Sequence, residues 1–270
     1  MFQLNRRPSR RRTIRMACRP EPQSVSTRRP QEASPRLPGC ARVAAVFFLC
    51  LLASPAAMAQ ADANAHMWLQ YFGDHPLVST RWGVRLEAQF RRHDVLRAPH
   101  NLLLRPALDF RLHPDREITA GYGYVSHHRS GAYPAARSWD EHRLFQDVKL
   151  HHAANRARLL HRFRFENRWL VNGLYENRFR YMARTKIPLH GPWYLAAWNE
   201  AFAPVKPEQF PRFLERNRAT LAVGKRVTDH VRVETGYMLQ TVWQRNGRIR
   251  EDNHTVVFAL SGTAPLFGKR

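Results

Sequence analysis

Residues 81–91 read RWGVRLEAQFR, a stretch in which apolar and polar side chains alternate without a break. Successive side chains of a β-strand point to opposite faces, so this stretch predicts a strand with one apolar and one charged face. The apolar face would carry Trp82, Val84, Leu86, Ala88 and Phe90.

The same alternation recurs along the rest of the chain. It predicts nine further strands, at 101–112, 117–128, 139–152, 157–170, 175–189, 193–203, 214–227, 231–242 and 253–263. Tight turns at 113–115, 154–155, 190–192 and 229–230 alternate with mostly longer connections, such as 129–138 and the loop through Asn246 and Gly247. This pattern is typical of an all-β fold, an antiparallel up-and-down transmembrane β-barrel of about ten strands, with twelve as the alternative.

An even strand number places both ends of the barrel on the short-turn side, which faces the periplasm in this class. We therefore expect the barrel over 81–263 and a C-terminal tail at 264–270. The segment 60–80 does not fit as an eleventh strand without parallel closure. We expect it to lie in the lumen or to cap the periplasmic mouth.

An export signal precedes this region. Residues 43–53, VAAVFFLCLLA, are too short for a membrane-spanning helix of about 20 residues, and Ala57 and Ala59 predict cleavage before Gln60. Residues 1–59 are thus interpreted as a signal peptide with a long basic leader. All three cysteines lie within them, so the mature chain would hold neither a disulfide nor a thiolate metal site.

The charge is strongly basic, with 44 Lys+Arg against 21 Asp+Glu. Residues 1–59 contain 11 basic and 2 acidic residues, which leaves 33 and 19 for the mature chain. The arginines are spread over nearly every expected strand instead of forming one patch, which excludes a nucleic-acid role for an exported chain. An anionic solute stays open as a partner.

A soluble barrel with an apolar interior would show the same alternation, so periodicity does not decide which face points outward. The aromatic residues favour a membrane barrel, because they stand near both ends of the expected strands, as in the girdles of bilayer interfaces. Those near short turns are Trp82 and Trp193, and those near longer loops are Phe90, Tyr124, Trp169 and Trp243.

Several stretches carry a family resemblance when taken together and in order. They are WLQYFGD at 68–74, LLLRP at 102–106, EHR at 141–143, HRFRFE at 161–166 and NRFRY at 177–181. With these stretches the chain resembles the proteobacterial family called domain of unknown function 2490, over about residues 66–262. The resemblance implies an outer-membrane β-barrel of a Gram-negative bacterium, with unestablished activity and no catalytic residues to carry over. The end of the chain departs from the usual terminal aromatic residue of barrel proteins, since Phe267 is followed by three more residues.

On this interpretation the charged faces line the lumen, where cations predominate. One reading is a network of ion pairs that fills a narrow barrel, and the other is an anion-attracting channel. The function expected is thus a structural barrel or a narrow channel with a cationic lumen. The lumen-lining residues would be Arg85, Glu87, Arg105, Asp109, Glu141, Arg143, Arg162, Arg164, Glu166, Arg168, Arg178, Arg180, Arg184, Arg218 and Glu234.

The alternative is a lipid hydrolase or acyltransferase that acts at the outer rim, where Ser126, His127, His128 and Ser130 would lie. No motif fixes their geometry. The adjacent pair at 151–152, like that at 127–128, points to opposite faces of a strand and is poorly suited to one metal ion. We expect no metal and no cofactor. The expected partners are outer-membrane lipids, lipopolysaccharide and the barrel assembly machinery.

The two faces differ in their expected response to substitution. Phe163→Arg should block assembly or strongly destabilise the barrel, because an arginine would face lipid, whereas Arg164→Gln, one residue along and inward, should leave it assembled with at most altered lumen electrostatics.

Overall fold

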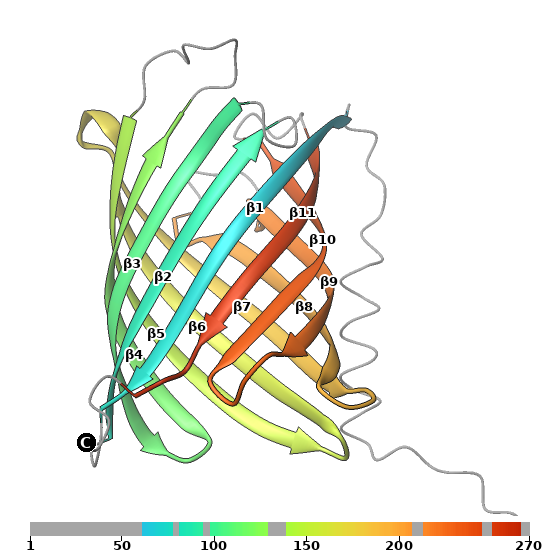
Figure 1. Ribbon diagram of the computed structural model, residues 1–270. Helices are drawn as coiled ribbons and strands as arrows, with labels where there is room; N and C mark the ends of the chain where they lie inside the picture. Colours follow the sequence, from blue (N-terminus) through green and yellow to red (C-terminus); the bar gives the residue numbers. More distant parts are fainter. Residues whose placement is uncertain are drawn as a thin grey trace, which may run out of the picture. The chain divides into compact units, whose positions relative to one another are not determined.

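The structure is a computed structural model that describes residues 61–77, 81–93, 98–128, 139–206, 213–244 and 250–265. The export segment and its cysteines lie outside these residues, as do the expected loops at 129–138 and 246–247. No helix in the described part is long and apolar enough to cross a membrane. The strands are β1 (Ala61–Pro76), β2 (Trp82–His93), β3 (Ala98–His113), β4 (Arg116–His127), β5 (Trp139–Ala154), β6 (Ala157–Trp169), β7 (Tyr175–Pro188), β8 (Trp193–Pro204), β9 (Arg216–Arg226), β10 (Val231–Trp243) and β11 (Arg250–Gly262), with a short 3-10 turn, η1, at Val171–Gly173 (Figure 1).

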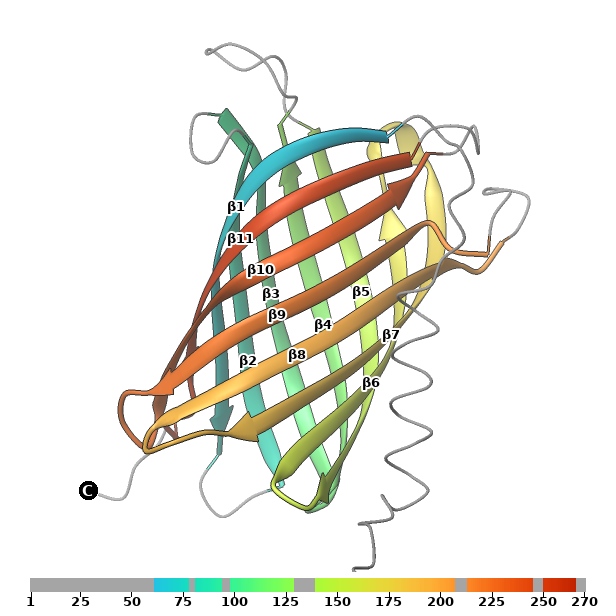
Figure 2. The ribbon, with the colours of Figure 1, turned by 90° about the vertical axis from the view of Figure 1, so that its right-hand side faces the viewer.

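The strands form one closed barrel in which each strand pairs with its neighbours in sequence. All these neighbouring pairs are antiparallel, and the wall is closed by a parallel pair between β1 and β11, in which Trp68 lies opposite Val257. Figures 1 and 2 show these two strands side by side and running in the same direction. The all-β up-and-down barrel expected from the sequence is therefore present.

The expected strand number was wrong, because the described residues form eleven strands where we expected ten. The segment 60–80 supplies the additional strand: Ala61–Pro76 is part of the wall and neither lies in the lumen nor caps a mouth. Parallel closure satisfies the backbone groups of β1 on both sides, through β11 and β2. Because the number of strands is odd, the start of β1 and the end of β11 lie at opposite ends of the barrel.

The two rims differ in their connections. At the short-turn rim β1, β3, β5, β7 and β9 end, and the described turns there are 114–115, 155–156, 189–192 and 227–230. Asn155 and Gly191 adopt positive φ there, at 54° and 59°, as tight turns of this kind require. At the opposite rim, the long-loop rim, β2, β4, β6, β8 and β10 end, and the short turn η1 follows β6 there. β1 starts at the long-loop rim and β11 ends at the short-turn rim.

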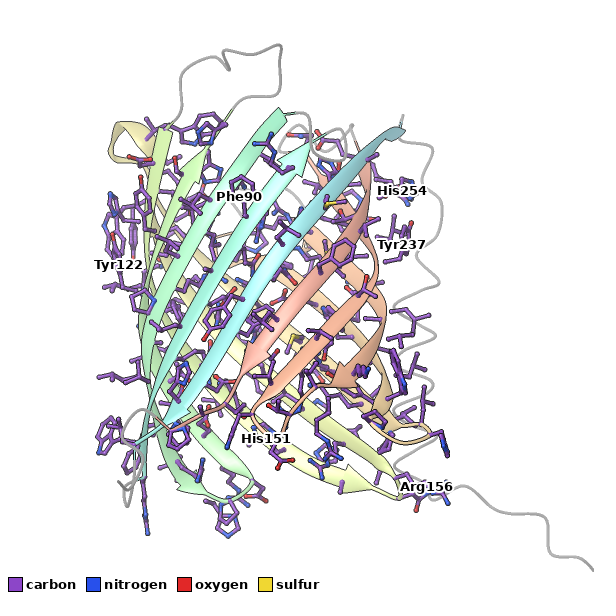
Figure 3. The ribbon with its side chains drawn as sticks, in the orientation of Figure 1. Phe90, Tyr122, His151, Arg156, Tyr237 and His254 are labelled. Atoms are coloured by element: carbon purple, nitrogen blue, oxygen red, sulfur yellow. The ribbon has the colours of Figure 1, made fainter. Side chains whose placement is uncertain are left out.

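Burial alternates along the strands with the period of the pleat. In β5 the side chains of Glu141, Arg143 and Asp147 are buried inside the barrel, whereas Leu144 and Val148, at the alternate positions, are exposed on the outside. Most of the other strands alternate in the same way, so the interior of the barrel is rich in charged residues and its exterior is mostly apolar. Figure 3 shows side chains projecting from the outer face of the wall, among them Phe90, Tyr122 and Tyr237.

Candidate functional site

A buried ion pair lies at mid-height inside the barrel. Asp147 of β5 and Arg164 of β6 are directly opposed cross-strand partners, and Nε and Nη2 of Arg164 donate to the two carboxylate oxygens at 2.6 and 2.7 Å. Each residue is only 1 % exposed. The guanidinium of Arg164 also lies 4.2 Å from the ring centre of Phe145. The ring takes the space that a side chain at Gly121 would need, since a Cβ there would lie 2.5 Å from it.

Glu166 is the centre of a second buried cluster. Its carboxylate is 0 % exposed and accepts hydrogen bonds from Arg178 at 2.5 Å and from Arg180 at 2.6 Å. Arg105, which comes from β3 on another part of the wall, approaches the same carboxylate to 3.6 Å. The contacts of Arg178 and Arg180 join neighbouring strands, whereas that of Arg105 crosses the interior, because β3 and β6 are not neighbours in the wall.

The short-turn half of the interior is filled in the same way. Arg85 of β2 donates to Asp109 and to Glu117, each at 2.7 Å, and so links three strands. Further round the barrel, Arg184 of β7 reaches Glu234 of β10. Buried charges are costly unless they are paired and hydrogen-bonded, and these groups meet that requirement.

The long-loop half of the interior contains a cavity of about 660 Å³. Of the described acidic residues, only Glu251 lines it, whereas eight arginines do. Six carboxylates that pair with most of these arginines lie outside its lining. The charged groups that a solute would meet there are thus mostly guanidinium groups. The arginines are Arg91, Arg105, Arg143, Arg168, Arg178, Arg180, Arg216 and Arg218.

Two inward-facing aromatic rings hold several of these arginines in place. The indole of Trp68 contacts the guanidinium groups of Arg91 and Arg218, which lie 3.9 and 4.8 Å from its ring centre. The ring of Phe202 contacts Arg180 at 4.4 Å and Arg218 at 4.6 Å. Stacking on an aromatic face stabilises a desolvated guanidinium and restricts its orientation. The cationic wall is therefore ordered.

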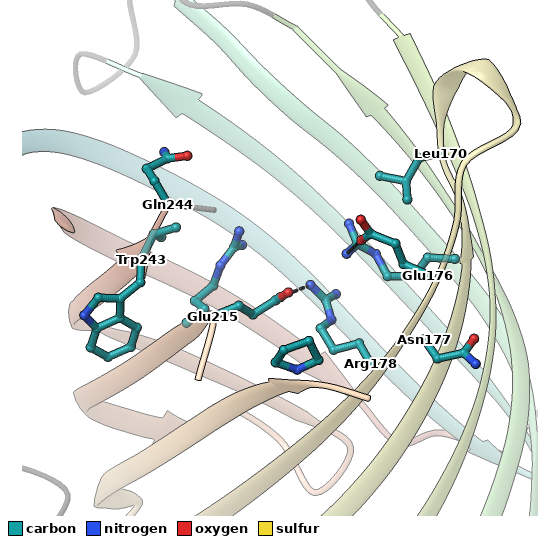
Figure 4. Close-up of a pocket in the computed structure, with 11 residues that line it drawn as sticks. Leu170, Glu176, Asn177, Arg178, Glu215, Trp243 and Gln244 are labelled. Carbon is teal, nitrogen blue, oxygen red and sulfur yellow. Dashed lines mark hydrogen bonds and ion pairs between the residues drawn. The ribbon is translucent and has the colours of Figure 1, made fainter. Parts of the chain in front are cut away.

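A smaller cavity of about 190 Å³ adjoins the first at the long-loop rim and shares Arg168, Arg178 and Arg216 with it. Figure 4 shows Glu215 reaching across to Arg178, and their hydrogen bond measures 2.6 Å. The backbone of Glu215 is held by hydrogen bonds to Phe202 and Trp243. Burial tends to raise the pKa of Glu215, but the positive charges of Arg178 and Arg216 outweigh it and lower the pKa to about 2.

The lowered pKa makes a pH-dependent contribution to stability. A carboxyl whose pKa falls from 4.5 to about 2 on folding stabilises the folded state fully above its unfolded pKa, and this stabilisation is lost as the pH falls toward 2. We expect Glu215→Gln to lower the free energy of unfolding at pH 7 by about 1–3 kcal/mol. Urea titrations of both proteins at pH 7 and pH 3 should show the difference shrinking at pH 3. An equal difference at both values would contradict this assignment.

The structure buries twelve of the fifteen expected lumen residues inside the wall and leaves Arg162, Arg168 and Arg184 half-buried there. It divides them into two groups. Six line the larger cavity, namely Arg105, Arg143, Arg168, Arg178, Arg180 and Arg218. Nine take part in the ion pairs around it and below it, namely Arg85, Glu87, Asp109, Glu141, Arg162, Arg164, Glu166, Arg184 and Glu234.

Several residues of the site were not among those expected. Arg91 continues the alternation of 81–91 and could have been included on that signal. Glu200 accepts hydrogen bonds from Arg162 and Arg180. It lies on the same inward face of β8 as Trp198, and this mixture of charged and aromatic residues weakened the alternation that predicts the strand. Trp68 was missed because the segment 60–80 was not expected to be a strand, and Phe202 because only charged side chains were expected to line the lumen.

The candidate enzymatic residues at the long-loop rim do not come together. His127 points inward, where its Nε2 lies 2.9 Å from Glu141, whereas its neighbour Ser126 points to the outer face of β4. The two therefore cannot form a nucleophile and base pair. Ser130 lies outside the described residues. Likewise, no group of three or more metal-binding side chains is found among the described residues.

Three comparisons relate the chain to known proteins. The family model described as "Protein of unknown function (DUF2490)" matches residues 65–251. No curated protein matches the chain. Among solved structures the chain is similar to that of the NanC porin in a rhombohedral crystal form, with a TM-score of 0.41 and 9% sequence identity, over 68% of this chain and 85% of the porin chain.

Proposed function

The chain belongs to the DUF2490 family of proteins of unknown function, as its sequence motifs indicate, and we propose that it is an outer-membrane β-barrel closed to ion flow. In this proposal the barrel is a structural one, and its interior is sealed at mid-height by ion pairs. Its cationic cavity opens toward the long-loop rim. Outer-membrane lipids and lipopolysaccharide surround the wall, and the barrel assembly machinery inserts it.

The outer face of the wall supports the membrane location. Large apolar side chains such as Leu108, Leu221 and Phe258 are 54, 55 and 42 % exposed, and a soluble barrel would turn such residues inward. Exposed aromatic residues stand at both ends of the wall, with Trp193 at the short-turn rim and Trp169 at the long-loop rim. Apolar bands flanked by aromatic girdles are characteristic of membrane barrels.

The burial of charged groups at mid-height carries the proposal that the barrel does not conduct. Asp147, Arg164 and Glu166 project into the interior, yet none is more than 1 % exposed. A water-filled channel through the barrel would leave the residues that line it accessible to water. These side chains contact each other and Phe145 instead. The interior at this level is thus packed.

Planar-bilayer recording tests this proposal. We expect the wild-type protein to show no stepwise conductance at 1 M salt, where a channel of small bore would be detected. The matched variant replaces both Asp147 and Arg164 with alanine, which removes the ion pair without leaving an unpaired buried charge. This variant should conduct. Conductance steps in the wild-type protein would refute the sealed barrel and favour the narrow channel.

Cell fractionation tests the location separately. We expect the protein in the outer-membrane fraction, with heat-modifiable migration on gels as the sign of a folded barrel. Recovery as a freely soluble periplasmic protein would overturn the membrane proposal, whatever the conductance result.

A further inference from the structure

Two arginines of the larger cavity lack the carboxylate partner that the others have. Arg91 is 6 % exposed and donates to the neutral amide oxygen of Gln89 at 3.1 and 2.7 Å. The guanidinium carbon of Arg216 lies 5.8 Å from the ring centre of Phe202. Among the described residues neither forms an ion pair with an aspartate or a glutamate. The two come from β2 and β9, which are not neighbours in the wall.

Unused hydrogen-bond donors accompany these charges. The Nε groups of Arg105 and Arg216 and the Nε1 group of Trp68 are buried and have no acceptor among the described residues, and all three residues line the cavity. Each of these groups can only donate. A buried donor without an acceptor is costly to a fold, and this cavity gathers three of them beside two unpaired guanidinium groups.

We propose that this cavity is a binding site for a soluble solute that carries two or more carboxylate or phosphate groups. Such groups present several acceptor oxygens, which the planar forks of arginine bind in a bidentate manner. Two separate unpaired arginines favour a ligand with at least two anionic groups over a monoanion. The neutral amides of Asn101, Gln240 and Asn253 also line the cavity and suit the uncharged polar parts of such a solute.

A soluble ligand is favoured over a lipid headgroup by the closure of the wall. All eleven described strands are paired on both sides, so a headgroup whose acyl chains stay in the bilayer has no lateral entrance to the cavity. The inference rests on the outer-membrane barrel of the proposed function, with its closed wall, but it does not depend on whether the barrel conducts.

Isothermal titration of the detergent-purified protein with pyrophosphate and with citrate tests the inference. We expect one site per chain for at least one of the two probes. Arg91→Gln and Arg216→Gln should each weaken binding about tenfold, and the double variant about a hundredfold, since each removes a charge-assisted contact. Neither arginine donates a hydrogen bond to a buried carboxylate in the described residues, and Glu215 keeps its hydrogen bond from Arg178 in Arg216→Gln, so both variants should still fold and show heat-modifiable migration.

Arg226→Gln is the matched control, because it removes the same charge from an exposed position at the short-turn rim. Its affinity should equal that of the wild type. No binding of either probe to the folded wild-type protein would overturn the inference, as would equal weakening by Arg226→Gln. Binding of phosphatidic acid micelles with neither soluble probe bound would assign the site to lipid and also refute it. A conducting barrel that binds citrate would refute only the sealed barrel.

Discussion

Arg164→Gln is expected to lower the free energy of unfolding by about 3–5 kcal/mol, the usual effect of removing one partner of a buried ion pair. Asp147 would keep its negative charge at 1 % exposure, without the two hydrogen bonds that Arg164 donates to it. The stacking of Arg164 on Phe145 would also be lost. Urea titration of the protein in lipid vesicles measures the change.

The double variant Asp147→Asn with Arg164→Gln separates this cause from a general loss of packing. It removes both charges and keeps side chains of similar size, so we expect it to recover most of the lost stability. An exposed control, Arg226→Gln, should change the free energy of unfolding by less than about 0.5 kcal/mol. If Arg164→Gln were as mild as this control, the buried pair would not stabilise the barrel.

This expectation differs from the one that the sequence suggested for Arg164. Alternation assigned the residue to the interior, and the structure places it there. Alternation does not tell how far the interior is filled, so a packed ion-pair network and a channel both stayed open, and Arg164→Gln was expected to leave the barrel assembled. The contacts that fill it, such as that of Arg105 with Glu166, join residues 61 positions apart on strands that are not neighbours. Such pairings depend on barrel closure and on the length of the side chains.

The eleventh strand was missed for a related reason. Strand β1 places His66 and Trp68 on its buried face and Met67 and Leu69 on the other, so both faces carry apolar or aromatic residues. The period-two signal is therefore weak. Parallel closure is also uncommon in up-and-down barrels, and the ten clear strands already satisfied an even count. Local sequence contains no information on which strand β1 joins.

The cavity could not be located from the sequence either, although most of its arginines were expected in the interior. Its boundary depends on where carboxylates and aromatic rings fill the space between strands. Phe145 fills it at mid-height, whereas Trp68 and Phe202 lie within the cavity wall. All three aromatic rings face inward, against the rule that placed aromatic residues on the outside. These three inward-facing rings help to set the boundary of the larger cavity.

The second large loss of stability is expected for Phe163→Arg. Phe163 lies on β6, next to Arg164, but on the opposite, outer face of the strand. Phe163 is the middle residue of β6 and 36 % exposed on the outer face, beside Tyr181 at 5.0 Å between ring centres. If the wall spans a membrane as proposed, this position lies near the bilayer midplane, where a lipid-facing arginine costs about 2–4 kcal/mol. We expect that loss in urea titrations in vesicles, together with a reduced fraction of heat-modifiable protein.

Phe163→Leu is the control for Phe163→Arg, because it shortens the side chain but stays apolar and should cost far less. The two destabilised variants also differ in what restores them. Arg164→Gln should be rescued by Asp147→Asn, whereas Phe163→Arg should not, since Asp147 lies on the inner face and cannot reach the new charge. If Phe163→Arg and Phe163→Leu were equally stable in vesicles, the outer face would not contact lipid, and the membrane proposal would fail at its central point.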